Sequence, residues 1–220
     1  MALIKSISGI LGTIGGKPGD GLTPPDIVRF TAAFGTWVTH QGISNKRPVI
    51  ALGRDARISG EMVQNLVAGT LKGLGIDVIY MGLCTTPGVE MAVVDLKADA
   101  GIILTASHNP KQWNALKLLN RKGEFISAAD GAEVLRIADA GEFSFAEVNK
   151  LGRYTTEPNY HLKHIEKILA LPLVDVKAIK AKKFKVVIDC VNSVGGIAVP
   201  ALLKALGVEE TIELYCEPNG

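Results

Sequence analysis

Short apolar runs alternate along most of the chain with segments in which apolar residues recur three and four positions apart. The apolar runs predict strands at 48–53, 76–81, 100–104, 115–119, 186–190 and 211–215. The helical spacing predicts helices at 24–41, 60–74, 86–96, 128–140, 158–170 and 197–206. Strands that alternate with helices are typical of an α/β fold. We therefore expect a mixed β-sheet covered by helices.

Helix start and stop signals support these assignments. Thr23 with Asp26 and Ser127 with Asp130 have the spacing of N-terminal capping boxes, in which each side chain satisfies a free backbone amide. Gly75 follows the second helix, where a glycine commonly ends a helix. These local signals set the helix boundaries.

The periodic pattern breaks down between residues 140 and 158, which are polar and contain glycine. We place a domain boundary near Tyr154. Residues 1–154 are expected to form one complete α/β domain, and residues 155–220 the beginning of a second, similar domain. The second domain looks incomplete because one and a half strand–helix units do not close a doubly wound fold.

Composition narrows the class of protein. Hydrophobic residues make up 47% of the 220 positions, enough for a sizeable core. The net charge of +2, without a basic run and with 5% aromatic residues, argues against a nucleic-acid partner and a polybasic membrane anchor. The longest apolar stretches fall short of the roughly 20 residues that span a bilayer, and the N-terminus lacks signal-peptide features. We expect a cytoplasmic protein with no membrane partner.

Cysteine and histidine positions suggest no metal site. Cys84, Cys190 and Cys216 are widely spaced and form no CxxC pair, so neither a disulfide framework nor a zinc site is indicated, and we expect buried free thiols. His161 and His164 are a close pair on an expected helix, where we interpret them as exposed residues rather than zinc ligands.

The clearest chemical signal is the sequence TASHNP, residues 105–110, directly after the expected strand 100–104. Ligands of open α/β sheets bind at the carboxyl ends of strands. Ser107 could act as a nucleophile or carry a phosphate, and His108 could transfer a proton. Ser and Asn are also ordinary turn residues, which leaves a purely structural interpretation open. A hydrolase elbow of the GxSxG type is excluded because no glycine flanks Ser107 at the required positions.

A second candidate for phosphate binding lies near the N-terminus. Gly9, Gly12, Gly15 and Gly16 could present backbone amides to an anion, although a glycine-rich loop alone is weak evidence.

The TASHNP sequence, with Lys117 seven residues after Pro110, resembles the phosphoserine loop of the α-D-phosphohexomutase family. This family includes phosphoglucomutase, phosphomannomutase and phosphoglucosamine mutase. Three further stretches match the family in order and approximate spacing: SGILGTIGG at 8–16, GRDAR at 53–57 and DCVNSVGG at 189–196. The resemblance extends over essentially the whole chain.

The resemblance implies a hexose phosphate substrate and a two-step phosphoryl transfer. Ser107 would be phosphorylated, would donate its phosphoryl group to a sugar monophosphate, and would take back the other phosphate of the bisphosphorylated sugar. His108 and Lys117 match positions that assist proton transfer and bind phosphoryl oxygens, while Thr105 and Asn109 would contact substrate or phosphate. Mg²⁺ would contact Ser107 through its phosphate.

Three departures from the family pattern qualify that expectation. Leu11 stands where the family usually has a phosphate-binding Arg, and Ala115 stands where it usually has Gly. No DGDxDR-type loop, which supplies the three Mg²⁺-binding aspartates, occurs in the sequence. The chain thus resembles the front portion of a four-domain enzyme, and we expect no mutase activity from these 220 residues alone. In the GRDAR stretch, we expect Arg54 and Asp55 to brace the fold.

Two other hypotheses remain open at this point. The chain could be a short phosphosugar-binding or interaction module that reuses the fold without catalysis, which Leu11 favours. It could also self-associate through the open sheet edge expected near residues 211–215.

Overall fold

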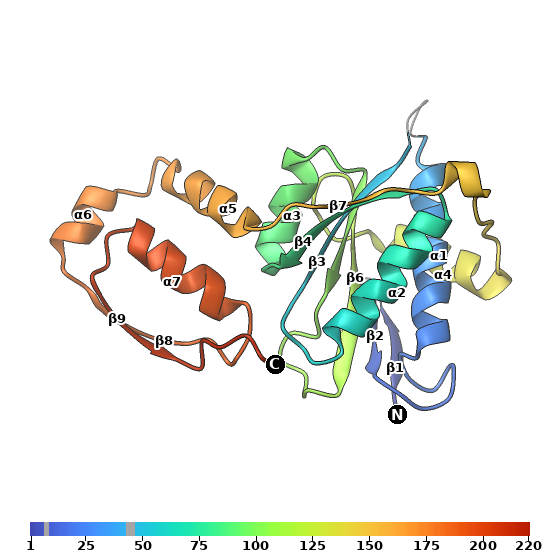
Figure 1. Ribbon diagram of the computed structural model, residues 1–220, viewed down its shortest axis with the longest axis horizontal. Coiled ribbons are helices and arrows are strands. Elements are labelled where there is room, and N and C mark those ends of the chain that lie inside the picture. The colour runs from blue at the N-terminus through green and yellow to red at the C-terminus, as the bar shows by residue number, and fades with distance from the viewer. Residues whose placement is uncertain (7–8, 43–46) are drawn as a thin grey trace.

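Two β-sheets organise the part of the chain that the computed structural model describes, residues 1–6, 9–42 and 47–220 (Figure 1). Ser8, which opens the glycine-containing N-terminal stretch, lies outside the described residues. The larger sheet has the strand order β1-β2-β6-β5-β3-β4-β7. Its strands are β1 (Leu3–Ser6), β2 (Gly9–Thr13), β3 (Val49–Arg54), β4 (Asp77–Leu83), β5 (Ala100–Leu104), β6 (Trp113–Leu119) and β7 (Tyr154–Thr156).

The larger sheet is mixed, as the sequence predicts. Strands β5, β3, β4 and β7 run parallel to one another, whereas β1, β2 and β6 pair antiparallel, and β6 joins the two groups by pairing antiparallel with β5. The parallel strands bring the carboxyl ends of β3 and β5 to the same edge of the sheet. This edge is where the TASHNP sequence leaves β5.

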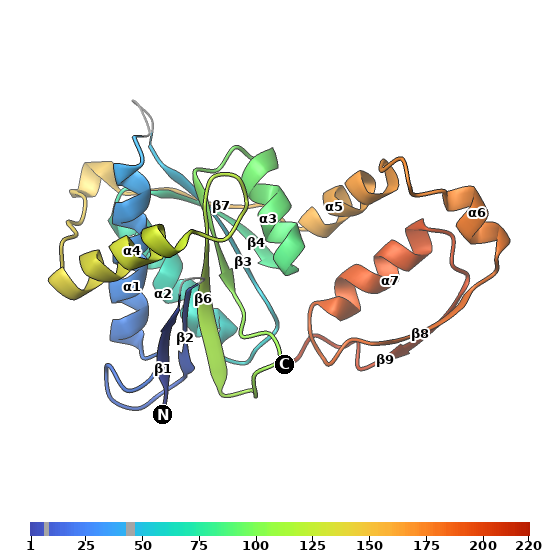
Figure 2. The same cartoon turned by 180° about the vertical axis from the view of Figure 1, so that it is seen from behind.

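Helices cover both faces of this sheet (Figures 1 and 2). On one face lie α1 (Pro24–His40), α2 (Gly60–Gly73) and α4 (Ala128–Ala140), and on the other lies α3 (Thr86–Asp95). Successive side chains of a strand point to opposite faces of the sheet, so the core has two parts. Leu52 and Ile102 pack with α1, α2 and α4, whereas Ala51 and Ile103 pack with α3. Both faces are buried, which explains why the strands read as nearly continuous apolar runs.

A second unit follows the larger sheet and lies beside its α3 side (Figure 1). It contains α5 (Tyr160–Leu169), α6 (Val176–Ala181), β8 (Lys185–Asp189), α7 (Gly195–Ala205) and β9 (Glu210–Leu214). Strands β8 and β9 form a parallel two-stranded sheet. Tyr160, at the start of α5, is 1% exposed and packs in the core beneath α3, so it anchors the second unit to the first.

The predicted strands and helices are all found, with boundaries shifted by a few residues, and several short elements were not predicted. These are β1, β2, β7, α6 and a 3-10 turn at Val148–Lys150. Strand β7 starts at Tyr154 and pairs with β4, so the larger sheet continues through Thr156, just past the expected domain boundary. The division at residue 154 stays a prediction.

Two of the four N-terminal glycines considered above lie in a strand rather than in a phosphate-cradling loop, whereas Gly15 and Gly16 follow that strand. Gly9 and Gly12 lie in β2, which pairs with β1 and β6. A Cβ on Gly9 would lie 2.0 Å from the Leu116 carbonyl oxygen, so glycine is needed there for close strand approach rather than for an anion.

No helix among residues 1–6, 9–42 and 47–220 is long and apolar enough to cross a membrane.

Candidate functional site

Ser107 lies in the loop that leaves the carboxyl end of β5, and its backbone is left-handed, with φ of 54°. For a residue with a Cβ this conformation costs roughly 1–2 kcal/mol, so the surrounding structure must hold it. Two hydrogen bonds between residues close in sequence help to hold this conformation. The Ser107 amide donates to Thr105 Oγ1 (3.2 Å), and the Asn109 amide donates to the Ala106 carbonyl (3.0 Å).

Arg57 holds the rest of this loop. Its Nη2 donates to the carbonyl oxygens of Ser107 (2.8 Å) and Asn109 (2.7 Å). Its Nη1 donates to the carbonyl oxygens of Pro110 (2.9 Å) and Trp113 (3.0 Å). One guanidinium thus binds four backbone carbonyls, and the planar fork of Arg suits this arrangement.

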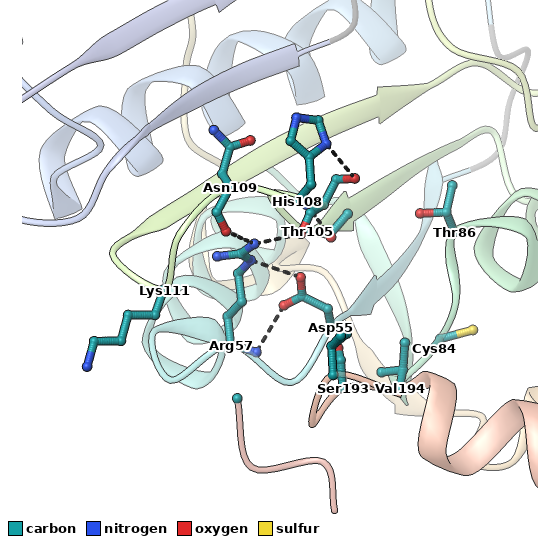
Figure 3. Close-up of a pocket in the computed structure, with 13 residues that line it drawn as sticks. Asp55, Arg57, Cys84, Thr86, Thr105, His108, Asn109, Lys111, Ser193 and Val194 are labelled. Carbon is teal, nitrogen blue, oxygen red and sulfur yellow. Dashed lines mark hydrogen bonds and ion pairs between the residues drawn. The ribbon is translucent and has the colours of Figure 1, made fainter. Parts of the chain in front are cut away.

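Asp55 orients Arg57. Its carboxylate pairs with Arg57 Nε at 3.2 Å and also accepts the Arg57 amide at 3.0 Å (Figure 3). Both side chains are only 11% exposed. Arg54 lies beside them, with Nε donating to the Tyr80 hydroxyl (3.0 Å) and Nη1 donating to the Asp55 carbonyl (3.0 Å). Asp55 and Arg54 therefore make the bracing contacts that the sequence predicts.

The role of Arg57 was not predicted from the sequence. The four carbonyl groups that it binds lie 50 to 56 residues away along the chain, so no local sequence pattern links them to Arg57. The available signal was its place in the GRDAR stretch, at the carboxyl end of the strand next to β5.

A cavity of about 630 Å³ opens on one side of Ser107. The first unit contributes four of the predicted residues to its wall: Thr105, Ser107, His108 and Asn109. The second unit contributes Val191 and Ser193, from the turn after β8 (Figure 3). The volume falls within the range of about 300–1,000 Å³ typical of small-molecule sites.

His108 is the proton-transfer candidate nearest to Ser107. Its Nδ1 lies 3.4 Å from Ser107 Oγ, and both side chains are solvent-accessible in the loop. At this distance a small rotation brings the imidazole into hydrogen-bond contact with the hydroxyl.

A smaller cavity of about 240 Å³ lies on the other side of Ser107 and contains the fifth predicted residue, Lys117. Leu11 pairs with Ala115 across the β2–β6 ladder, and Gly9 pairs with Lys117, so these positions share one face of the sheet. The Lys117 ammonium lies 6.0 Å from the ring centroid of Phe125. No ion pair is found for Lys117 within the described part of the chain, and the residue lines the smaller cavity.

The two departures from the family pattern in this region can now be assessed. Leu11 lines the smaller cavity, where it offers an apolar surface at a position from which a longer cationic side chain could contact an anion. Ala115 is buried in β6 and is not among the described residues with positive φ, so an alanine causes no backbone strain there.

Burial favours the neutral forms of two further titratable groups. Burial raises the pKa of the Cys84 thiol to about 12, so the thiol stays protonated at neutral pH although it borders the larger cavity. Burial also lowers the pKa of His161 on α5, which favours its neutral form.

The described residues do not form a site for a hard dication. Among residues 1–6, 9–42 and 47–220, no group of three or more His, Cys, Asp or Glu side chains could hold a metal ion. Asp55, the carboxylate that borders the larger cavity, is already paired with Arg57. A cation such as Mg²⁺ needs several oxygen ligands, and a phosphate on Ser107 would provide only part of that set.

Comparison with known protein families gives two matches. Residues 4–145 match the family described as phosphoglucomutase/phosphomannomutase, alpha/beta/alpha domain I. Residues 160–220 match alpha/beta/alpha domain II of the same family.

Individual relatives agree. A phosphoglucomutase/phosphomannomutase from Thermococcus kodakarensis is 34% identical over 96% of this chain and 45% of its own length. A phosphoglucosamine/phosphogalactosamine mutase from Sulfurisphaera tokodaii is 33% identical over 84% of this chain and 39% of its own length. The crystal structure of a phosphoglucomutase/phosphomannomutase family protein from Burkholderia thailandensis is 26% identical, with a TM-score of 0.77, over 98% of this chain and 46% of that one. The chain spans less than half the length of these relatives.

Proposed function

Because the chain belongs to the phosphoglucomutase/phosphomannomutase family, we propose that Ser107 carries a phosphoryl group and exchanges it with a hexose phosphate. The observation that carries this proposal is the placement of Ser107. Ser107 lines both cavities at the carboxyl end of β5, on a strained loop that Arg57 holds by four carbonyls.

The proposed transfer has two symmetrical steps. In the first, a free hydroxyl of a hexose monophosphate attacks the phosphorus of phosphorylated Ser107; the new P–O bond forms as the bond to Oγ breaks, the hydroxyl gives up its proton, and Oγ gains one. In the second, Ser107 Oγ attacks the other phosphate of the bisphosphorylated sugar and gives up its proton; the bond from that phosphorus to the sugar oxygen breaks, the sugar oxygen gains a proton, and a hexose monophosphate leaves as phosphoserine is regenerated. Each step conserves the phosphoryl group, so no other reactant is consumed.

The neighbouring side chains would transfer the proton, stabilise the phosphoryl charge and bind the substrate. His108 lies close enough to Ser107 Oγ to give and take the proton that the oxygen gains and loses in the two steps. Lys117 provides a positive charge from the smaller cavity for the phosphoryl oxygens. Thr105 and Asn109 line the larger cavity, where the sugar phosphate would bind. We assign no step to Mg²⁺, because the described residues do not complete its ligand set.

Loading of Ser107 tests this function. The 220-residue protein would be incubated with a hexose 1,6-bisphosphate, and both released hexose monophosphate and intact protein mass would be measured. We expect a gain of one phosphoryl group per chain and an equal amount of monophosphate. Ser107→Ala should abolish both, whereas Ser193→Ala, on the opposite wall of the same cavity, should retain loading. Equal loading of native protein and Ser107→Ala would refute the assignment.

We do not expect these 220 residues to sustain turnover. A coupled assay with glucose 1-phosphate, mannose 1-phosphate and glucosamine 6-phosphate as substrates would test this, and activity above background would contradict it.

The expected cytoplasmic location, the two-domain division and self-association through the edge of β9 likewise remain predictions. Light scattering that finds a monomer at all concentrations would argue against self-association.

A non-catalytic phosphosugar-binding module is the second candidate, and Leu11 in the smaller cavity is the observation that favours it. Such a module would bind a hexose phosphate in calorimetry but would leave Ser107 unmodified after incubation with the bisphosphate. The two measurements together separate the candidates.

A further inference from the structure

Two cysteines that are far apart in the sequence meet in the second unit. Cys190 directly follows β8, and Cys216 lies two residues after β9, the neighbouring parallel strand. Both contact one backbone group: the Cys190 amide donates to the Leu214 carbonyl at 3.0 Å, and Cys216 Sγ lies 3.5 Å from the same oxygen. The two residues are thus fixed around a single carbonyl.

The local backbone departs from regular strand geometry beside the pair. Alternation of side chains ends at Tyr215, whose φ of 51° is left-handed, and the Cys216 thiol lies close enough to Cys190 to help raise the pKa of the Cys190 thiol. Gly195 and Gly196, which open α7, cover the pair. A Cβ on Gly195 would lie 3.5 Å from Cys190 Sγ, and a Cβ on Gly196 would lie 1.9 Å from the Cys216 carbonyl oxygen.

Further bonds join the segments that carry the cysteines. The Asn192 amide donates to the Tyr215 carbonyl at 2.7 Å, and its side chain donates to the Glu217 carbonyl at 3.1 Å. The two segments that carry the cysteines therefore form an ordered strand-end junction.

We propose that Cys190 and Cys216 are a thiol modification site that closes to a reversible intramolecular disulfide under a peroxide oxidant. Cys216 is the more exposed of the two; Cys190 is 5% exposed. The Cys216 thiolate attacks a peroxide oxygen and becomes a sulfenic acid, and hydrogen peroxide is reduced to water. The Cys190 sulfur then displaces water from that sulfenic acid, forming the S–S bond. The sum is two thiols and one hydrogen peroxide giving one disulfide and two waters.

The environment of Cys190 suits the second of these roles. Burial, the contact with Cys216 and the nearby carboxylates of Asp189 and Glu213 raise the pKa of the Cys190 thiol to about 11. A thiol held protonated reacts slowly with peroxide, which leaves Cys216 to be oxidised first; in the second step the Cys190 proton leaves with the sulfenic hydroxyl as water.

The disulfide would act on the larger cavity. Val191 and Ser193, which border that cavity, follow Cys190 immediately, and Val191 itself has a left-handed φ of 45°. A covalent link from Cys190 to Cys216 would fix the start of this turn against the end of β9. Oxidation would therefore restrict the second-unit wall that faces Ser107.

Mass spectrometry of the purified 220-residue protein tests the proposal independently of phosphoryl transfer. After treatment with hydrogen peroxide, we expect free thiols to fall from three to one, with peptide mapping that links Cys190 to Cys216 and full recovery on reduction. Cys84→Ser should form the same link, whereas Cys216→Ser should not. Serine is close in size to cysteine, and circular dichroism would confirm that each variant folds.

Three outcomes would overturn the proposal: sulfinic or sulfonic acid at Cys216 without a link, a disulfide that involves Cys84, or a disulfide between two chains. Because the readout does not involve Ser107, failure here would leave the proposed function standing. Conversely, an unphosphorylated Ser107 would not affect the cysteine pair.

Discussion

Replacement of Arg57 by lysine tests whether the geometry of the Ser107 loop depends on one side chain. Lysine keeps the positive charge and most of the aliphatic stem, but its single ammonium cannot reach four carbonyls and a carboxylate together. The four carbonyls belong to Ser107, Asn109, Pro110 and Trp113, at distances of 2.7 to 3.0 Å from the guanidinium. We therefore expect Arg57→Lys to loosen the loop without removing the charge.

The magnitude follows from the contacts that are lost. Hydrogen bonds to a charged group contribute about 1.5–3 kcal/mol each to stability, and breaking one partner of a buried ion pair costs about 3–5 kcal/mol. A lysine ammonium can retain the pairing with Asp55 and one carbonyl, and water can reach part of the vacated space, so we expect a loss of about 2–3 kcal/mol. That is a large fraction of the roughly 5–15 kcal/mol by which a domain is stable.

Urea denaturation measures this loss, and Arg136→Lys is the matched control. Arg136 also makes ion pairs, with Glu133 and Glu142, but its side chain is 50% exposed. Exposed pairs of this kind contribute about 0–1 kcal/mol. Amide hydrogen exchange should show the same contrast, with faster exchange at residues 105–113 in Arg57→Lys and no local change in the control.

Two results would refute this reasoning. One is a free energy of unfolding for Arg57→Lys within about 0.5 kcal/mol of that for Arg136→Lys, the scatter usual for surface substitutions. The other is unchanged exchange at residues 105–113 despite a loss of stability, because the contacts would then support the fold but not the loop.

The remaining predictions address acid stability and two of the three departures from the family pattern, Leu11 and Ala115. Burial acts to raise the pKa of Asp95, but hydrogen bonds from Tyr160 and Lys167 outweigh it and lower the pKa overall. The contribution of Asp95 to stability is therefore present above about pH 4 and disappears as the pH falls through the lowered pKa. Asp95→Asn should therefore lower the urea midpoint at neutral pH, and the midpoints of variant and native protein should converge in acid; a gap that is constant with pH would contradict this. Leu11→Arg should strengthen binding of a hexose phosphate about tenfold or more in calorimetry, since a charged hydrogen bond is worth about 1.5–3 kcal/mol, while Leu11→Gln should not. Ala115→Gly should destabilise the protein by about 0.5–1 kcal/mol, because Ala115 has ordinary strand backbone, and an increase in stability would show that Ala115 is strained.

Local chemistry made much of the fold predictable from the sequence. The start of α1 follows from Thr23 and Asp26, which lie three positions apart and bond each other, with Asp26 accepting the Thr23 amide at 3.3 Å. The buried strands β3 and β5 follow from apolar runs that need no knowledge of their neighbours. In contrast, β1 is short and mostly exposed, and it forms because β2 pairs with both it and the distant β6.

The site was predictable only in part, for the same reason. Ser107 and its neighbours in sequence were identified from a contiguous motif, and the structure places four of the five predicted residues around one cavity and Lys117 in another. The roles of Arg57 and of the Cys190–Cys216 pair depend on which strands are adjacent in the sheets, which spacing along the chain does not reveal.

The central claim is that Ser107 is the residue that accepts the phosphoryl group. Its most direct test is peptide mapping of the native protein after incubation with a hexose 1,6-bisphosphate. The account predicts one phosphate, located on Ser107 in the loop 105–110. A phosphate located on any other residue, or an unmodified Ser107 in protein that binds the bisphosphate, would contradict it.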